Sequence, residues 1–523
     1  MVFIIILSVC AFGLRAYPRF ILKYNYLHDT FVHLYVASEI RKNRFVVPSK
    51  IARIMMTHRH DYPFLYHYFL ALFPGPVRFW VERFTGALFD TASVVLLFFF
   101  AQTMVEYYQL PTLLPYYFAG LYAFSPALLR LGSGPRAYNG SPRVLAQTLY
   151  FSHILTFFLF TVTGQWWFAA ASVLAGALLF VNSKFGVQAL VFFTLFFTIF
   201  FSYQYILFLI SSFVLSNIIT FGRAFQVLEG QYRYSHFYFF HLQQILLFNN
   251  KYFHKSFSDY QKILRDHFYI LRTRFDLYKI ASWFFEESYF LHVLVAVFTP
   301  FFILPLYIFY PPTHPIELFM IVWALAGLCM YIFTKIKRFL FLGEAERYAE
   351  YALPASLFLA VDLILFKDLP FLLIIFGVYY LISALFYLHK YFQRYEVINA
   401  KFNKTAALFE QINEYPTGNL MPIGIEFWQA LYRTKHPILT LGINVDTRKL
   451  PIEEFMLVYA HYPLPSKDFE KIISDYDIDY IFTKKHELEK YTREIAEDAQ
   501  IVDKYFEVVG TAEDFIFMKK RAN

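Results

Sequence analysis

The sequence predicts a polytopic α-helical membrane protein that ends in a soluble α/β domain. The chain has 523 residues and is 58% hydrophobic and 22% aromatic, with 16% charged residues and a mean hydropathy of +0.43. A soluble domain usually has about 25% charged residues. This composition leaves too much apolar surface for a water-soluble core. After Lys390 the composition changes, because the chain becomes richer in Asp and Glu and has no apolar run of span length.

The apolar runs predict the membrane spans. A helix needs about 20 mainly apolar residues to cross the hydrocarbon core, with about 17 at the short end of the range. We expect about 11 spans, near 2–16, 83–105, 112–131, 144–163, 165–182, 185–202, 205–221, 289–310, 316–334, 351–366 and 370–389. The first run lacks the basic start and the small-residue cleavage site of a signal peptide, so we expect it to be retained. The predicted domains are therefore 1–390 in the membrane and 391–523 outside it.

The predicted loops divide unevenly between the two faces. One face receives 16–82, 132–143, 183–184, 222–288, 335–350 and the chain after 390, whereas the other receives only short turns. The short turns carry few charges and long loops escape the positive-inside rule, so this rule does not give the orientation. Nearly all polar chemistry is expected on one face.

The soluble tail has the pattern of a small α/β domain. We expect helices over Ser466–Tyr476 and His486–Asp498, a strand over Ile478–Thr483, and a hairpin formed by Tyr505–Val509 and Asp514–Met518.

Charge and cysteine usage exclude some functions. The net charge of +8 is spread along the loops, which fits contact with membrane lipids or phosphate groups and gives no case for nucleic acid. Cys10 and Cys329 both lie in apolar runs, so they indicate neither a disulfide framework nor a zinc site.

Two acidic residues of the first long loop are candidate catalytic groups. Asp29 precedes a predicted amphipathic helix that carries Phe31, Leu34, Tyr35 and Ser38 on one face, along the membrane surface. Asp61 lies in the segment His58-Arg-His-Asp-Tyr-Pro-Phe-Leu-Tyr-His67. Such a carboxylate can act as a general base toward an acceptor hydroxyl. The alternative for Asp29 is an N-cap, a role worth about 0.5–2 kcal/mol.

The first loop is also rich in histidine. Five of the 16 histidines lie between positions 28 and 67. Their spacing matches no compact ligand motif, and histidine and aromatic residues at a membrane interface are more often structural. We therefore assign no metal ligands and no certain cofactor, while a divalent metal stays an open alternative.

Two further loops supply candidate cations. The segment from Arg130 to Arg143 is rich in glycine, and Arg136 and Arg143 are candidates to hold a phosphate, with Lys184 on the same predicted face. The alternative is an ordinary turn with snorkelling side chains. In the segment Gly343-Glu-Ala-Glu-Arg-Tyr348, Arg347 and Tyr348 suit a lipid phosphate, whereas a Glu344–Arg347 surface pair would be worth about 0–1 kcal/mol.

These motifs, taken in order, resemble the GT-C superfamily of membrane glycosyltransferases that use polyprenyl-phosphate-linked sugars. The resemblance covers about residues 1–390 and rests on the short first helix, Arg15, Asp29, Tyr62-Pro-Phe-Leu-Tyr-His67, Gly140-Ser-Pro-Arg143 and Gly343-Glu-Ala-Glu-Arg-Tyr348. It implies an active site and a C-terminal domain on the extracytoplasmic side, with Asp29 as the acidic residue of the first loop. The second loop contains no acid, unlike the metal-binding pair of oligosaccharyltransferase-type sites.

The resemblance implies an enzyme that moves a hexosyl or pentosyl group with inversion from a polyprenyl-phosphate sugar. The acceptor would be a lipid-linked or polymeric glycan, or a protein. The alternative is a transporter or flippase of lipid-linked sugars, which would need ionisable residues inside the spans. Asp362 and Lys184 are the candidates for that role, and both lie nearer to span ends than to midpoints.

Overall fold

The computed structural model divides the chain into two compact units. The structure describes residues 1–21, 28–56, 60–129, 142–242, 265, 300–343, 345–424, 427–440, 452–461, 464–498 and 500–521. Unit 1 consists of Met1–Ile21, Arg83–Ala224 and His254–Gln393, and unit 2 of Leu22–Glu82, Phe225–Phe253 and Arg394–Asn523. Two long helices, α4 (Gly75–Tyr108) and α18 (Pro370–Glu414), run through a unit boundary.

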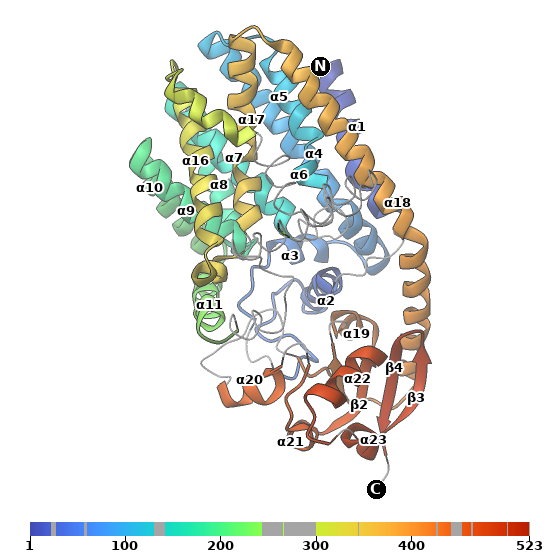
Figure 1. Ribbon diagram of the computed structural model, residues 1–523. Coiled ribbons are helices and arrows are strands. Elements are labelled where there is room, and N and C mark those ends of the chain that lie inside the picture. The colour runs from blue at the N-terminus through green and yellow to red at the C-terminus, as the bar shows by residue number, and fades with distance from the viewer. Residues whose placement is uncertain are drawn as a thin grey trace. The chain divides into compact units, whose positions relative to one another are not determined.

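Unit 1 is a bundle of apolar helices (Figure 1). Besides parts of α4 and α18, it contains α1 (Val2–Ile21), α5 (Leu114–Ala123), α6 (Pro126–Leu129), α7 (Pro142–Thr163), α8 (Trp166–Phe180), α9 (Lys184–Phe200), α10 (Gln204–Ile219), the 3₁₀ helices η5 (Pro300–Ile308) and η6 (Lys337–Leu342), α16 (Pro315–Thr334) and α17 (Ala345–Phe366). Aromatic side chains fill its core, for example Tyr150, Trp323 and Phe319. The predicted α-helical membrane fold is confirmed.

Fewer helices than expected have full span length. Within the described ranges five helices are long and apolar enough to cross a membrane: α1, α4, α7, α16 and α17. A sixth arises if α10 and the helix that follows it, bent by 116°, count as one span. The expected spans 165–182 and 185–202 correspond to the shorter apolar helices α8 and α9, 370–389 lies in the first part of α18, and 112–131 is divided into α5 and α6. Residues 289–299 of the expected span 289–310 lie outside the described residues.

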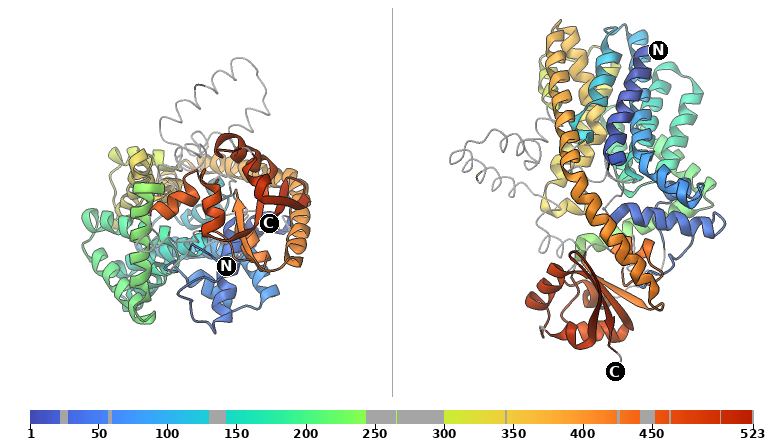
Figure 2. Two further views of the ribbon diagram at one scale, coloured as in Figure 1. Left: turned by 90° about the horizontal axis from the view of Figure 1, so that it is seen from below. Right: turned by 90° about the vertical axis from the view of Figure 1, so that its right-hand side faces the viewer.

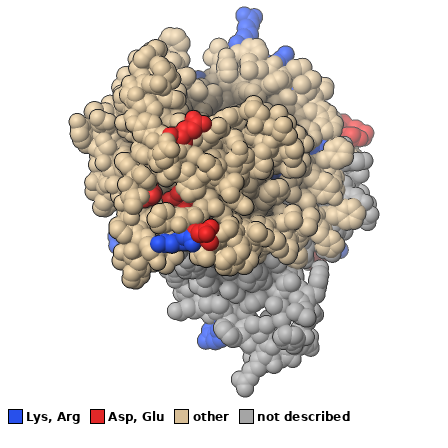
Figure 3. Space-filling model, turned by 90° about the horizontal axis from the view of Figure 1, so that it is seen from above, with Lys and Arg blue, Asp and Glu red and all other residues tan. Residues whose placement is uncertain are grey.

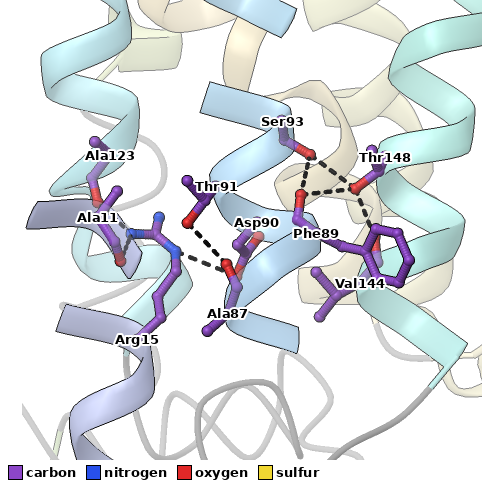
Figure 4. Close-up of polar contacts among 10 residues, drawn as sticks. All are labelled: Ala11, Arg15, Ala87, Phe89, Asp90, Thr91, Ser93, Ala123, Val144 and Thr148. Atoms are coloured by element: carbon purple, nitrogen blue, oxygen red, sulfur yellow. Dashed lines mark hydrogen bonds and ion pairs between the residues drawn. The ribbon is translucent and has the colours of Figure 1, made fainter. Parts of the chain in front are cut away.

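A few buried polar contacts connect the unit 1 helices (Figure 4). The Arg15 guanidinium on α1 pairs with Asp90 on α4, with Nε and Oδ2 3.3 Å apart, and its Nη1 donates to the Ala123 carbonyl at the end of α5 (2.8 Å). Ser93 on α4 and Thr148 on α7 share a hydroxyl hydrogen bond of 2.9 Å. Charged groups within a membrane are stable when they are paired in this way.

The short loops of unit 1 gather at the end of the bundle at which α1 begins. Seen from above, this face has few charged side chains among the residues drawn in colour (Figure 3). The polar ends of α7, α9, α16 and α17 therefore belong to the opposite end, in agreement with the uneven loops expected from the sequence.

Unit 2 is built around a four-stranded sheet (Figure 2). Its strands β1 (Asn419–Ile423), β2 (Ile478–Lys484), β3 (Phe506–Ala512) and β4 (Phe515–Lys520) have the order β1-β2-β4-β3. The first pair is parallel, and the other two pairs are antiparallel. The expected strand over 478–483 and the hairpin are confirmed, whereas β1 was not predicted.

Helices cover the sheet of unit 2. They are α19 (Phe427–Arg433), α20 (Ile452–Tyr459), α21 (Phe469–Asp475), α22 (Lys485–Glu494) and α23 (Ile501–Tyr505), together with the last turns of α18. Phe469 and Ile472 of α21 and Tyr491 of α22 lie in one buried cluster with Ile481 of β2. Phe409 of α18 instead contacts Phe482, the next residue of β2, with ring centroids 5.1 Å apart. The expected helices over 466–476 and 486–498 correspond to α21 and α22.

The first long loop is part of this same unit. Its helices are α2 (His28–Lys42) and α3 (Leu65–Ala71), and unit 2 also contains most of α11 (Arg223–Phe237) with its π-helical continuation η2 (Tyr238–Leu242). Ile54 forms a parallel bridge with Ile438, which in turn bridges to Leu420 of β1. The amide of Ile438 donates to the Arg53 carbonyl (2.7 Å). A segment of the first loop thus extends the C-terminal sheet.

Candidate functional site

Helix α2 carries the first candidate acid. Asp29 is the second residue of α2, and its side chain lies outside the part that the structure describes. Phe31, Leu34 and Tyr35 are buried, as the predicted apolar face requires. However, every residue from Thr30 to Ala37 is buried, so the middle of α2 is enclosed on all sides and not only along one face. The predicted surface helix is therefore a core element of unit 2.

Arg53 holds this part of the first loop in place. Its guanidinium donates to the carbonyl oxygens of Leu431 (2.8 Å) and Thr434 at the end of α19, where the last carbonyls of a helix lack intrahelical partners. It also lies over the Tyr35 ring of α2, 4.8 Å from the centroid. One side chain therefore joins the first loop, α2 and α19.

Asp61, the second candidate acid, precedes α3 and is 7% exposed. The backbone of α11 approaches it closely at Gly230. A Cβ at position 230 would lie 2.5 Å from the Asp61 Cβ and 3.0 Å from its carbonyl oxygen. Such distances are shorter than normal van der Waals contact, so glycine is required there for Asp61 to keep its place.

Histidine and aromatic rings surround the start of α3. His33 of α2 and His67 of α3 form a buried hydrogen bond, with Nδ1 and Nε2 2.8 Å apart. Tyr66 meets the His33 ring edge-on at 5.5 Å, and Tyr62 lies 5.7 Å from the His67 ring. Burial lowers the pKa of His67 to about 3. Burial is also the main cause that lowers the pKa of His33 well below its usual range, and the nearby His67 adds to this effect. Both rings are therefore neutral at physiological pH.

The residues with described side chains do not form the three-ligand cluster of a zinc-type site. Among them, no three His, Cys, Asp or Glu side chains come together in an arrangement that holds a metal ion. Catalytic zinc sites use three such protein ligands, whereas Mg²⁺ is often held by only one or two carboxylates together with substrate phosphates. The side chains of His28 and Asp29, together with His58, lie outside the described residues.

Unit 1 carries the candidate cations at one end of its bundle. Arg143, the second residue of α7, pairs with Glu350 of α17 at 2.7 Å, and Gln147 donates to the Glu350 carbonyl (2.9 Å). Lys335, just after α16, pairs with Glu346 at 2.5 Å. All four charged side chains are buried. Buried carboxylates that neutralise cations in this way keep both charges stable in a site of low dielectric.

Phe185, the second residue of α9, contacts the next two candidate residues. The Arg347 guanidinium lies over its ring, 5.4 Å from the centroid, and the Tyr348 ring is 4.6 Å away. Lys184 is the residue before it and begins α9, where Ser183 caps the helix by accepting from the Gly186 amide (3.3 Å). Tyr348 is fully buried and donates its hydroxyl to the Leu342 carbonyl (3.0 Å).

Four of the predicted phosphate-binding residues thus lie at or near the starts of α7, α9 and α17, at this one end of the bundle: Arg143, Lys184, Arg347 and Tyr348. Arg136 and Glu344 lie outside the described residues. The sequence analysis did not single out Lys335, Glu346 or Glu350. Glu346 and Glu350 are spaced four residues apart on α17, and this spacing on an otherwise apolar helix was the available signal.

No protein-family model and no curated protein matches the sequence. Solved structures do match. The oligosaccharyltransferase AglB of Archaeoglobus fulgidus, in complex with Zn and sulfate, is 12% identical with a TM-score of 0.56 over 96% of this chain and 71% of its own. The same enzyme with an inhibitory peptide and a dolichol-phosphate is 11% identical, with a TM-score of 0.54 over 97% and 72%.

ArnT of Cupriavidus metallidurans, bound to undecaprenyl phosphate, is 10% identical with a TM-score of 0.55. The match covers 100% of this chain and 98% of ArnT. The chain therefore shares the fold of AglB and ArnT.

Proposed function

We propose that the protein is an integral-membrane glycosyltransferase that transfers a sugar from a polyprenyl-phosphate donor to an extracytoplasmic acceptor. The observation that carries this proposal is the likeness over nearly the whole chain to AglB and ArnT, which were solved with a dolichol-phosphate and with undecaprenyl phosphate. The grouping of Arg143, Lys184 and Arg347 at one end of unit 1 supports it. The acceptor is a lipid-linked or polymeric glycan, or a protein.

The proposed reaction is a direct displacement with inversion. An acceptor hydroxyl oxygen attacks the anomeric carbon while the bond from that carbon to the phosphate oxygen breaks. The hydroxyl proton passes to the Asp29 carboxylate, with Asp61 as the second candidate base. The leaving polyprenyl phosphate takes the electron pair and stays anionic. Arg136, Arg143, Lys184 and Arg347 stabilise it, because preorganised cations act most strongly where charge develops.

Tyr348 has a supporting part in this proposal. Its hydroxyl donates to the Leu342 carbonyl, and its ring packs on Phe185. The Arg347 guanidinium lies over that same Phe185 ring. The proposal assigns no step to a divalent metal, and a divalent metal at Asp29 stays an alternative. The C-terminal sheet, which shares unit 2 with both candidate acids, would bind the acceptor on the extracytoplasmic side.

One observation favours a second function, a transporter or flippase of lipid-linked sugars. Asp362 lies within α17 and is 6% exposed. Ionisable residues buried inside a span are costly and commonly mark the path of a transported ion or substrate. The two functions predict different products, so a single set of assays separates them.

The test is sugar transfer by the purified protein in liposomes. Undecaprenyl- and dolichyl-phosphate-linked hexoses and pentoses with a radiolabelled sugar are offered with a membrane extract as acceptor. We expect transfer by the wild type and a loss of about 100-fold or more in Asp29→Asn, since general bases contribute about 10²–10⁴-fold. The matched control is Asp368→Asn, in the short turn between α17 and α18. Transfer that persists in Asp29→Asn but fails in Asp61→Asn would move the base to Asp61. Lipid–sugar movement across the bilayer without transfer would favour the flippase.

A further inference from the structure

The hydrogen bond between His33 and His67 joins two segments that are far apart in the sequence. His33 lies in the middle of α2, and His67 is the third residue of α3. The two rings are 4% and 0% exposed, and their Nδ1 and Nε2 atoms are 2.8 Å apart. At this distance one ring donates the shared proton and the other accepts it, which requires that at least one ring is neutral.

Each of these segments carries one candidate acid. Asp29 lies four residues before His33 in α2, a separation of about one helical turn. Asp61 lies six residues before His67, and its backbone is fixed from the other side by Gly230 of α11. The histidine pair is therefore a buried hydrogen bond between two side chains, one on α2, which carries Asp29, and one on α3, which follows Asp61.

The surroundings of the pair explain why histidine suits these positions. Tyr62 and Tyr66 pack on the rings, and the Tyr62 ring also stacks on His60, with centroids 6.3 Å apart. A buried polar group is costly unless its hydrogen bond is made, so the pair specifies one relative placement of α2 and α3. An apolar pair would lack this directional constraint between α2 and α3.

We propose that His33 and His67 are positioning residues, whose mutual hydrogen bond sets the placement of the Asp29 and Asp61 segments for sugar transfer. This inference rests on the proposed function. The pair touches neither donor nor acceptor in this proposal. It acts through the two acid-bearing segments, so its loss lowers the rate of the chemical step and leaves donor binding in unit 1 unchanged.

The geometry of the two nitrogens gives a selective test. The amide of asparagine reaches about as far as Nδ1 of histidine, and the amide of glutamine about as far as Nε2. His33 uses Nδ1 and His67 uses Nε2. We therefore expect His33→Asn and His67→Gln to keep kcat within a few-fold of the wild type. The exchanged variants, His33→Gln and His67→Asn, should lose about 10-fold or more in kcat with an unchanged KM for the donor.

A readout that needs no transfer keeps this test separate from the proposed function. Labelling of Asp29 and Asp61 by a water-soluble carbodiimide and an amine nucleophile, followed by mass spectrometry, reports the environment of each carboxylate. The exchanged variants should change the labelling rate of one or both acids by several-fold, whereas His33→Asn and His67→Gln should not. This holds even if no sugar donor is accepted.

The control for loss of stability is His153→Asn. His153 is an equally buried histidine of α7 in unit 1, where it bonds to Ser172. This variant should lower the melting temperature without changing kcat or the labelling of either acid. Equal kcat and equal labelling in all four variants of the pair would overturn the inference. So would a uniform loss that follows the melting temperature and ignores which amide was introduced.

Discussion

Arg15 and Asp90 form an ion pair inside the helix bundle of unit 1, with both side chains 3% exposed. The two residues come from α1 and α4 (Figure 4). Removing one partner of a buried pair leaves the other charge uncompensated, which costs about 3–5 kcal/mol. We expect Asp90→Asn to lower the thermal unfolding midpoint of the detergent-solubilised protein strongly.

Two variants control this prediction. Glu106→Gln, an exposed position on the same helix, should change stability by no more than about 0.5 kcal/mol. The double variant Arg15→Met/Asp90→Leu removes both charges and should recover most of the loss, since apolar replacements of a buried pair are often neutral. A midpoint for Asp90→Asn equal to that of Glu106→Gln would contradict the prediction.

Arg143 and Glu350 offer a test of the phosphate-binding role. Charge-assisted hydrogen bonds contribute about 1.5–3 kcal/mol, so Arg143→Met should weaken binding of undecaprenyl phosphate by about 10-fold or more. Binding is measured as the rise in melting temperature with added lipid. The single variant also leaves Glu350 buried without its cation.

The double variant Arg143→Met/Glu350→Leu separates the two effects. It should restore stability, because neither charge is left alone. It should not restore lipid binding if Arg143 contacts the phosphate. Recovery of both stability and binding would show that Arg143 is only the structural partner of Glu350.

The histidine pair predicts how stability depends on pH. The pKa of His67 is lowered to about 3 and that of His33 is also lowered, against 6.5 in the unfolded chain. The unfolded state therefore binds more protons below pH 6.5, so stability falls as the pH decreases from there towards about 3. His67 contributes about 1.4 kcal/mol per pH unit within this window, and the lowered pKa of His33 acts in the same direction.

Unfolding midpoints between pH 7.5 and 4.5 check this expectation. The double variant His33→Asn/His67→Gln removes both titrating groups and keeps hydrogen-bonding amides, so its midpoint should fall less steeply with decreasing pH. A slope identical to that of the wild type would mean that other groups dominate the acid response.

Much of the fold could be predicted from local sequence patterns. The remaining parts depend on contacts between residues that are distant in the sequence. The apolar run of α16 and the alternation in β2 and β4 are visible in short windows. In contrast, the enclosure of α2 depends on α3 and α19, and the pairing of Ile54 with Ile438 joins positions about 380 residues apart. Such burial has no local signal.

The candidate site shows the same division. The sequence singled out Arg143, Lys184 and Arg347 as cations at span ends, and in the structure they lie at or near the starts of α7, α9 and α17. The partner of Arg143 could not be assigned, because Glu350 lies on α17, 207 residues later in the chain. The partnership of His33 and His67 was hidden for a similar reason, since loop histidines in a sequence do not reveal which rings meet.

The contact between Gly230 and Asp61 gives the last prediction. A methyl group at position 230 would lie 2.5 Å from the Asp61 Cβ and 3.0 Å from its backbone oxygen, so Gly230→Ala must displace either α11 or the Asp61 segment. We expect a loss of stability of about 1–3 kcal/mol, the usual range for overpacking. Transfer activity should fall together with a changed carbodiimide labelling of Asp61.

Gly377→Ala is the matched control for this substitution. Gly377 also lies within a helix, α18, but a Cβ there meets no atom within 4 Å. Alanine favours the helix over glycine by up to about 1 kcal/mol, so this control should be neutral or slightly stabilising. Equal melting temperatures and equal Asp61 labelling for the two variants would show that α11 accommodates the methyl group without moving Asp61. In that case Gly230 has no positioning role.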